Sequence, residues 1–304
     1  MTMSLSEQVP SLTSRIANLA QRLKLTGKTP RLVLERASRL QFAFEPLPEP
    51  QPNIFWHEGP PLQHLVDLPR GALSGPVQED KARAHLALTK LVTKVSEFHP
   101  QFDLRQIDGL SGQPLDGRTY PTFEAFAATP VCRKVRIISY RDFTRALSHA
   151  LPRFEQKETI QLRQASWLGE RIYWAGEQHA ATFAAAIAYA RRRGLDTALP
   201  AELTDYRLDL AGVQALQAAY HVLAMPASAW DDPVFVGLLL DGQVPYARLT
   251  LLRNTSNSEL LLLEKGHVTA NALGEGLKLA GSPDAITYLK SLPQITRFRR
   301  GSPL

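Results

Sequence analysis

The chain has 304 residues, of which 44% are hydrophobic and 21% charged, and it carries a formal net charge of +6. These proportions are typical of a folded protein of one or two domains and exclude a wholly disordered chain. Because Cys132 is the single cysteine, the sequence also excludes a scaffold held by internal disulfides, a cysteine-rich zinc module and a cysteine-bound iron–sulfur cluster.

The N-terminal part of the chain is predicted to be helical or irregular. Two segments have apolar residues at helical spacing, and a stretch with eight prolines, residues 44–76, lies between them. This stretch is too apolar for a free linker, so we expect it to be extended and packed onto the protein. The predicted elements are a helix over residues 11–25, a helix over residues 78–98 that Pro100 ends, and a loop over residues 101–130.

Strands are predicted to mix with helices from about residue 131. The predicted strands are residues 131–139, 159–165, 171–174, 246–252 and 260–263, and the second and third form a β-hairpin. The predicted helices are residues 141–151, 178–193, 210–223, 269–280 and 284–292. We therefore expect an α+β protein, in which an irregular, mostly helical N-terminal half (residues 1–130) packs on a C-terminal α/β domain (residues 131–304) with a small mixed sheet.

The most informative segment is a predicted strand that runs into a Gly-Glu turn at the start of the alanine-rich helix. The first turn of a helix has backbone N–H groups without internal partners, and its dipole favours anions. Gly176 lets the backbone approach a ligand, Glu177 could orient a ribose or a metal-bound water, and His179 could donate to a phosphate or shuttle a proton. The candidate residues are Gly176, Gln178 and Ala180 for ligand binding, and Glu177 and His179 for catalysis.

The residues around this turn match the pattern of a known fold. Gly176, Glu177, Ala180 and Ala184, with Arg193-Gly194 at the helix end, correspond to a Gly-Glu-x-Arg box, an alanine-containing helix and a basic-Gly ending. About residues 158–205 thus resemble the nucleotide-binding core of the ParB/sulfiredoxin-like fold. The resemblance implies binding of nucleotide phosphates, with the acidic residue aiding hydrolysis. Gln178 and His179 stand where ParB proteins have arginines, and the chain as a whole resembles an uncharacterised bacterial family.

Several residues have alternatives that the sequence leaves open. The Gly-Glu turn could be purely structural, with its acid complementing the helix dipole. Cys132 is predicted in a strand as a core thiol, with a nucleophile as the alternative. His57 and His64 lack a third ligand at metal-site spacing, so no metal site is predicted. Tyr220 and His221 are expected at a helix end, where a buried or capping histidine is favoured over a catalytic one.

The leading functional hypothesis is binding, with hydrolysis as a further step, of a nucleotide or another phosphorylated small ligand at residues 176–180; no cofactor is identified. One alternative is a scaffold protein whose protein partner lies along residues 44–76. Another is a nucleic-acid-binding protein that uses the arginines at 191–193 and 297–300. No apolar run is long enough to span a membrane and residues 1–15 do not resemble a secretory signal, so we expect a cytoplasmic protein.

Overall fold

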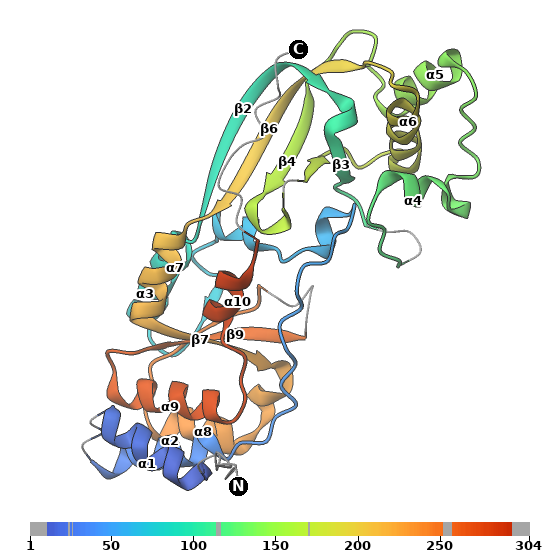
Figure 1. Cartoon of the computed structure of the whole chain (residues 1–304). Coiled ribbons are helices and arrows are strands. Elements are labelled where there is room, and N and C mark those ends of the chain that lie inside the picture. Colours follow the sequence, from blue (N-terminus) through green and yellow to red (C-terminus); the bar gives the residue numbers. More distant parts are fainter. Residues whose placement is uncertain are drawn as a thin grey trace, which may run out of the picture. The chain divides into compact units, whose positions relative to one another are not determined.

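The computed structural model describes residues 11–23, 25, 27–113, 117–169, 171–251 and 257–293. Their contacts divide the chain into two compact units that alternate along the sequence. The first unit comprises the described residues of Met1–Leu47, Pro69–Leu88 and Val213–Lys290, and the second those of Pro48–Leu68, Thr89–Gly212 and Ser291–Leu304. Each unit has its own sheet, and the expected α+β class is confirmed (Figure 1). The boundary predicted near residue 130 lies inside the second unit and stays a prediction.

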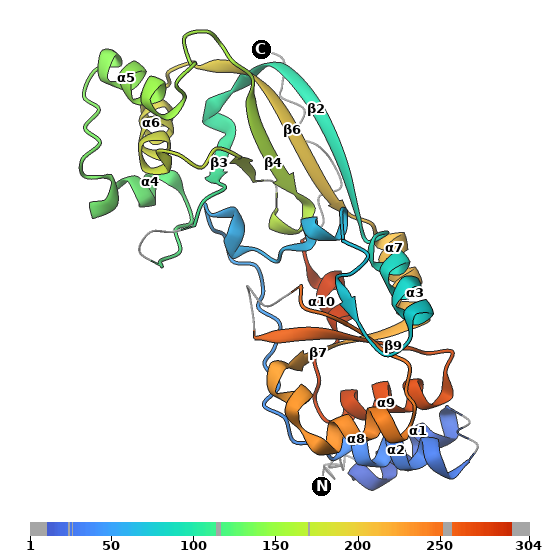
Figure 2. The same ribbon diagram turned by 180° about the vertical axis from the view of Figure 1, so that it is seen from behind.

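The first unit is built on a four-stranded antiparallel sheet with the order β1-β8-β9-β7. Its strands are β1 (Leu73–Ser74), β7 (Tyr220–Pro226), β8 (Ala247–Leu249) and β9 (Ser258–Glu264). Its helices are α1 (Leu12–Arg22), α2 (Lys28–Ser38), α3 (Gln78–Leu88), α8 (Pro233–Asp241), α9 (Val268–Leu279) and α10 (Ala285–Ser291). Figures 1 and 2 show α2, α8 and α9 on one side of β7 and β9, with α3 and α10 on the other. Most strand residues of β7 and β9 are buried because helices cover both faces.

Helices α2 and α9 approach each other closely in the core of the first unit. Leu34 and Ala37 on α2 and Leu273 and Leu277 on α9 are fully buried. A Cβ atom on Gly276 would lie 2.6 Å from the Cβ of Ala37 and 2.8 Å from the carbonyl oxygen of Leu34. The absence of a side chain at Gly276 therefore sets the separation of the two helices.

The second unit is built on a five-stranded sheet with the order β2-β6-β4-β5-β3. Its strands are β2 (Val92–Asp103), β3 (Ile107–Leu110), β4 (Ile160–Ala165), β5 (Ile172–Trp174) and β6 (Ala198–Leu208). The sheet is mixed, as expected, because β6 pairs antiparallel with β2 and parallel with β4, while β5 pairs antiparallel with β4 and parallel with β3. The hairpin predicted over residues 159–174 is confirmed as β4 and β5.

Three helices pack beside this sheet: α4 (Phe123–Ala127), α5 (Tyr140–Ala150) and α6 (Ala180–Arg193) (Figure 2). Their buried side chains, among them Phe123, Phe143 and Phe183, share one core with Leu162 and Leu203 of the sheet. Gly194 ends α6 in the left-handed conformation with φ 64°. The helix predicted over residues 178–193 is therefore confirmed, with a slightly later start.

The proline-rich stretch packs onto the protein as predicted. Within the second unit, Ile54, Phe55 and Trp56 are at most 3% exposed. The ring nitrogen of Trp167 donates to the carbonyl oxygen of Pro60 over 3.0 Å, and this bond ties the segment to the end of β4. Because its large apolar side chains are covered by the chain itself, the segment offers little apolar surface to a protein partner along residues 44–76, and that partner stays a prediction.

Two predicted helices are wrong in their C-terminal parts. The helix predicted over residues 78–98 ends at Leu88 as α3. Residues 92–98 instead belong to β2, which pairs with β6 from Val92↔Leu208 to Asp103↔Ala198. The spacing of Val92, Val95 and Phe98 suits a helix, yet Val95 and Phe98 are 50% and 60% exposed on the strand. The helix predicted over residues 210–223 ends at Ala219 as α7 (Leu210–Ala219), and β7 follows, because pairing with β9 overrides the local helical pattern.

The segment around Cys132 also differs from the prediction. Residues 131–139 do not form a strand; Pro130–Cys132 is a short 3-10 helix, and an irregular segment leads from there to α5. Pro130 suits the start of the 3-10 helix, because proline favours the first turn of a helix. Ser139 begins α5 with a capping box that Asp142 completes. The loop predicted over residues 101–130 contains the end of β2, β3 and α4.

The substitution Gly276→Ala is expected to lower the free energy of unfolding by about 1–3 kcal/mol, because the added methyl group collides with the backbone and side chain of α2. A gain in helix propensity of about 1 kcal/mol offsets part of this loss. The measurement is chemical unfolding followed by circular dichroism, with Gly71→Ala as the control, since a Cβ atom on Gly71 would meet nothing within 4 Å. An unchanged or raised stability of Gly276→Ala would show that the two helices can separate without cost.

Candidate functional site

The candidate turn begins where β5 ends at a buried tryptophan. Trp174 is 5% exposed, and its indole stacks on Phe183 of α6 with ring centroids 4.1 Å apart and an interplanar angle of 23°. A Cβ atom on Gly176 would lie 2.1 Å from the nearest indole atom. Glycine is required at this position because the backbone passes too close to the indole for a side chain, and not because of a positive φ angle.

His179 stands at the boundary between the turn and α6. It adopts the left-handed conformation with φ 54°, and its side chain does not cap the helix. Its imidazole instead lies against that of His149 at the end of α5, with ring centroids 3.8 Å apart. The two exposed imidazoles therefore form a pair that links the start of α6 to the end of α5.

A hollow of about 340 Å³ opens beside this turn. Its apolar wall includes Trp174, Leu199 and Ile160. Its polar lining comprises Arg153, Glu158, Thr159, Gln161, Glu177 and Gln178. A volume of this size, with one apolar side and a few polar groups, suits a small organic ligand.

The hollow is lined by only some of the predicted site residues. Gly176, Glu177 and Gln178 line it, whereas His179 and Ala180 are not part of its lining. The amides of the first turn of α6 therefore lie beyond the lining, although the sequence argument relied on them. The roles predicted for His179 and Ala180 stay predictions.

Arg153 provides the positive charge that the turn itself lacks. It lies in the loop between α5 and β4, and its Nη1 atom is 3.1 Å from Oε1 of Glu158. Both side chains are largely exposed, so the pair is screened by solvent and is open to a competing anion. Sequence analysis did not identify Arg153, because it lies more than 20 residues before the turn and outside any motif.

Cys132 is a core thiol, as favoured from the sequence. It is 2% exposed, and its sulfur donates to the carbonyl oxygen of Ala181 over 3.8 Å. Burial raises the pKa of the thiol above its ordinary value, which disfavours the reactive thiolate. The expectation of a core thiol holds, although the strand on which it was placed does not exist.

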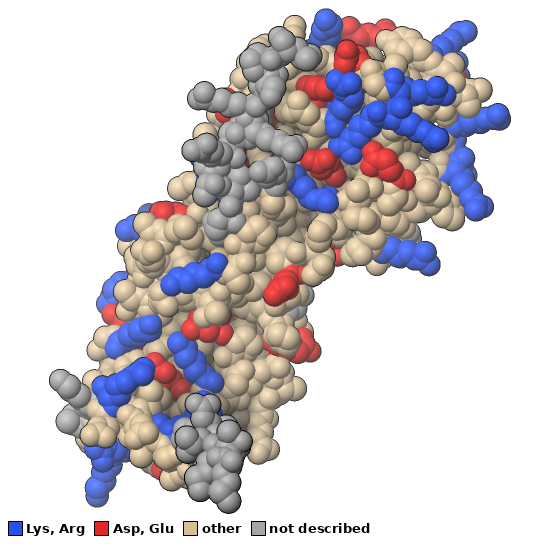
Figure 3. All heavy atoms as spheres, in the orientation of Figure 1, with Lys and Arg blue, Asp and Glu red and all other residues tan. Residues whose placement is uncertain are grey.

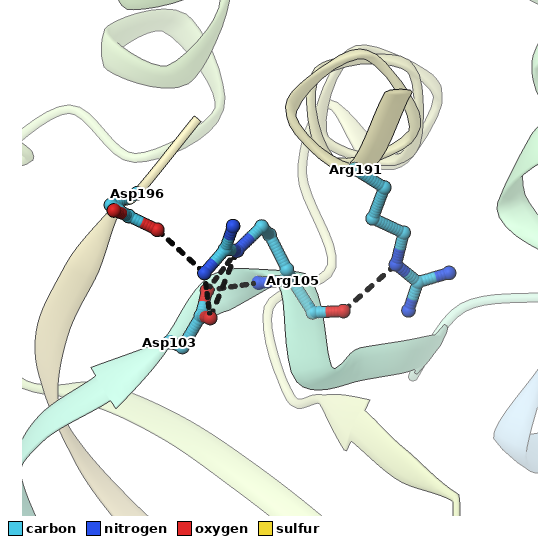
Figure 4. Close-up of polar contacts among 4 residues, drawn as sticks. All are labelled: Asp103, Arg105, Arg191 and Asp196. Atoms are coloured by element: carbon cyan, nitrogen blue, oxygen red, sulfur yellow. Dashed lines mark hydrogen bonds and ion pairs between the residues drawn. The ribbon is translucent and has the colours of Figure 1, made fainter. Parts of the chain in front are cut away.

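The arginines at the end of α6 have unequal surroundings. Arg191 donates from Nε to the carbonyl oxygen of Arg105 (Figure 4) and from Nη2 to that of Ile107, each over 2.8 Å. It also pairs with Asp108 at 2.9 Å, while Arg105 is held by Asp103 and Asp196. Arg191 thus anchors the C-terminal end of α6 to the segment that joins β2 and β3.

Arg192 and Arg193, by contrast, are exposed. The predicted basic tail, Arg297, Arg299 and Arg300, lies outside the described residues. The nucleic-acid hypothesis therefore retains Arg192 and Arg193 from the arginine run, because Arg191 is committed to internal contacts.

His221 in the first unit is a buried histidine on a strand and not at a helix end. It is 1% exposed, its Nε2 atom lies 2.7 Å from Oδ1 of Asn271, and burial lowers its pKa. Its ring packs so closely on α9 that a Cβ atom on Gly274 would lie 2.4 Å from it.

Within the described residues, no three His, Cys, Asp or Glu side chains are grouped as metal ligands.

Comparison with known proteins identifies the family of the chain. A model described as "Family of unknown function (DUF6685)" matches residues 97–302, which is more than half of the sequence. The chain belongs to the DUF6685 family. No curated protein and no solved structure matches it, so the resemblance to the ParB/sulfiredoxin-like fold stays a hypothesis. In the described part of this DUF6685 protein, no helix combines the length and apolar character needed to cross a membrane.

The substitution Arg191→Lys is expected to lower the free energy of unfolding by about 1–3 kcal/mol, because the single nitrogen of an ammonium group cannot stand in the positions of both Nε and Nη2, which bond the two carbonyl oxygens and Asp108. Arg192→Lys, the control on the neighbouring exposed residue, should change it by less than about 0.5 kcal/mol. Urea unfolding of both variants makes the comparison, and equal effects would contradict the anchoring role of Arg191.

Cys132 is expected to react with a thiol reagent at pH 8 much more slowly in the folded protein than in the unfolded chain. Burial limits access to the sulfur, and the raised pKa reduces the thiolate fraction at a given pH. Absorbance of the released chromophore measures both rates, with the protein in guanidinium chloride as the reference. A folded-state rate equal to the unfolded one would revive the nucleophile hypothesis.

Proposed function

We propose that the second unit binds a nucleotide or another phosphorylated small ligand in the hollow beside the Gly176 turn. The observation that carries this proposal is that Gly176, Glu177 and Gln178 line one hollow together with Arg153 and the wall formed by Trp174. The ParB/sulfiredoxin-like resemblance of the turn favours the same class of ligand. The expected cytoplasmic location, where such ligands are abundant, belongs to this proposal.

The two sides of the hollow suit the two parts of a nucleotide. The apolar wall formed by Trp174, Leu199 and Ile160 would take the base, because burying its flat apolar faces is favourable. Arg153 would pair with a phosphate through its planar guanidinium group. Arg153 thus supplies, from the loop between α5 and β4, the positive charge that an arginine would supply at the position of Gln178.

Glu177 has two roles in this proposal. As an exposed carboxylate on the lining it would accept hydrogen bonds from ribose hydroxyl groups. In the hydrolytic step it would take a proton from the attacking water, which is the usual task of a carboxylate base. His179 would need to leave His149 to take part, so we assign the proton transfer to Glu177.

Binding can be tested by the change in Tm with a panel of ribonucleotides and deoxynucleotides, with and without magnesium. A nucleotide present at 100 times its Kd should stabilise the protein by about 2.7 kcal/mol. The unphosphorylated nucleosides serve as the reference for the contribution of the phosphate. The absence of any shift across the panel would overturn the proposal.

Three variants test where the phosphate lies. Arg153→Gln should weaken binding of the nucleotide on the order of tenfold, because it removes a charge-assisted bond. Glu158→Gln should tighten binding, since it frees Arg153 from its internal partner. Glu155→Gln, on an exposed residue of the same loop that does not line the hollow, should change nothing. Titration calorimetry measures all three, and weaker binding by Glu158→Gln would contradict the assigned role of Arg153.

Hydrolysis is tested by release of inorganic phosphate from the nucleotide that binds best. Glu177→Gln should reduce the rate by about 100-fold or more while the protein still binds the nucleotide. If phosphate is never released by the unmodified protein, the binding proposal stands and its hydrolytic part fails.

A further inference from the structure

A second surface of the same unit is strongly basic and shares no residue with the lining of the hollow beside Gly176. It involves the irregular segment before α5, the start of α5 and the end of α6, and we call it the basic face. The basic face consists of Arg133, Lys134, Arg136, Arg141, Arg192 and Arg193, all of them exposed. In Figure 3, lysine and arginine side chains gather over this part of the second unit.

The basic face has no acidic partner within the described residues, although Arg193 lies over the ring of Tyr189. The part of the chain that the structure describes provides no ion-pair partner for any of the six residues. Two acids on the neighbouring helices have other partners: Asp142 binds Ser139 in the capping box, and Glu124 lies 3.4 Å from Arg191. The basic residues therefore remain available to an anionic partner, and their mutual repulsion is relieved when one binds.

A hollow of about 660 Å³ runs between α4, α6 and the segment before α5. Its apolar lining includes Val135 and Ile137 on one side and Ala185 and Ala188 on the other. Arg192 lies in its lining. Arg191 and Glu124 also line the hollow, whereas Arg133, Lys134 and Arg136 do not. The hollow thus lies between the irregular segment and the part of α6 that carries Arg192.

A row of aromatic side chains connects the same two segments. The guanidinium carbon of Arg193 lies 5.8 Å from the ring centroid of Tyr189, and Tyr189 stacks on Phe143 with centroids 6.0 Å apart. Phe143 in turn contacts Tyr140, which is 68% exposed. Tyr140 is thus an exposed ring supported from behind, so it can stack on a ligand with little loss of conformational entropy.

Exposed arginines combined with a supported aromatic ring are the two components of sites for single-stranded nucleic acids. Arginine pairs with phosphates along the backbone, and the ring stacks on an unpaired base of any identity. In a duplex the faces of the bases are hidden, so Tyr140 would have no partner. Insertion into a membrane interface needs a broad apolar face, whereas Ile138 is the exposed aliphatic residue within this segment.

We propose that the basic face of the second unit binds a single-stranded nucleic acid, with phosphates along Arg133, Arg136 and Arg192 and a base stacked on Tyr140. This site is separate from the proposed ligand site at Gly176. It assigns a function to Arg192 and Arg193 of the arginine run and adds the residues before α5, which sequence analysis placed in a strand.

The test is fluorescence anisotropy of the full chain with labelled 12-nucleotide strands of oligo(dT) and oligo(U), at salt concentrations from 50 to 200 mM, on the scale over which charge-driven binding weakens by orders of magnitude. The combined variant Arg133→Gln, Arg136→Gln and Arg192→Gln should lower affinity at least tenfold. It should also reduce the slope of log affinity against log salt by about 2, since each lost phosphate contact contributes about 0.7. The matched control is Lys28→Gln, Arg36→Gln and Arg70→Gln, which removes the same charge from exposed residues of the first unit.

Tyr140→Ala should weaken binding on the order of tenfold without altering the salt slope, because stacking carries no charge. All variants concern exposed side chains, and circular dichroism checks that they fold. Equal losses in the control triple, an unchanged affinity of Tyr140→Ala, or equally tight binding of a duplex would each overturn the proposal. So would binding to vesicles of phosphatidylcholine and phosphatidylserine by a protein that ignores both oligonucleotides. Arg153→Gln should leave oligonucleotide binding unchanged, which separates this test from that of the small-ligand site.

Discussion

The surface features of the second unit depend on how the chain passes Trp174. This tryptophan is the last residue of β5. Its indole stacks on Phe183, and the backbone at Gly176 passes close to the same ring. Because the chain must cross the indole before α6 can begin, the turn residues emerge beside an apolar wall and a hollow remains there. A larger side chain at position 176 would push the turn away from the indole, and the wall and the polar rim would no longer face the same space.

The two ends of α6 then have different tasks. The turn that precedes α6 carries Glu177 and Gln178, which line the hollow. At its end, Arg191 is bonded to the carbonyl oxygens of Arg105 and Ile107, which fixes the direction of the last helical turn. Arg192 and Arg193, the next residues, are held at the surface as a consequence. Of three consecutive arginines, one therefore stabilises the fold and two remain available for a partner.

The sequence predicted those parts of the fold whose pattern is local. The hairpin of β4 and β5, the capped helix α5 and the alanine-rich α6 all have turn or cap residues beside them, such as Gly194 and Ser139. The errors occur where distant pairing decides. Val92–Asp103 is a strand because it pairs with Ala198–Leu208, a segment about 100 residues away that was not predicted as a strand. Likewise, Gly176, Glu177 and Gln178 could be found from the strand–turn–helix pattern, whereas Arg153 reaches the same hollow through tertiary folding alone.

The alternation of the two units along the sequence has a consequence for synthesis of the protein. In the first unit, Leu73 of β1 pairs with Leu249 of β8, and α2 packs on α9. A nascent chain leaving the ribosome therefore exposes the apolar side of α2 until α9 (Val268–Leu279) has been translated. The intervening second unit can acquire its core earlier, because its sheet is complete once Leu208 has emerged. With this order of folding, we expect α2 and its neighbour α1 to need a chaperone during translation.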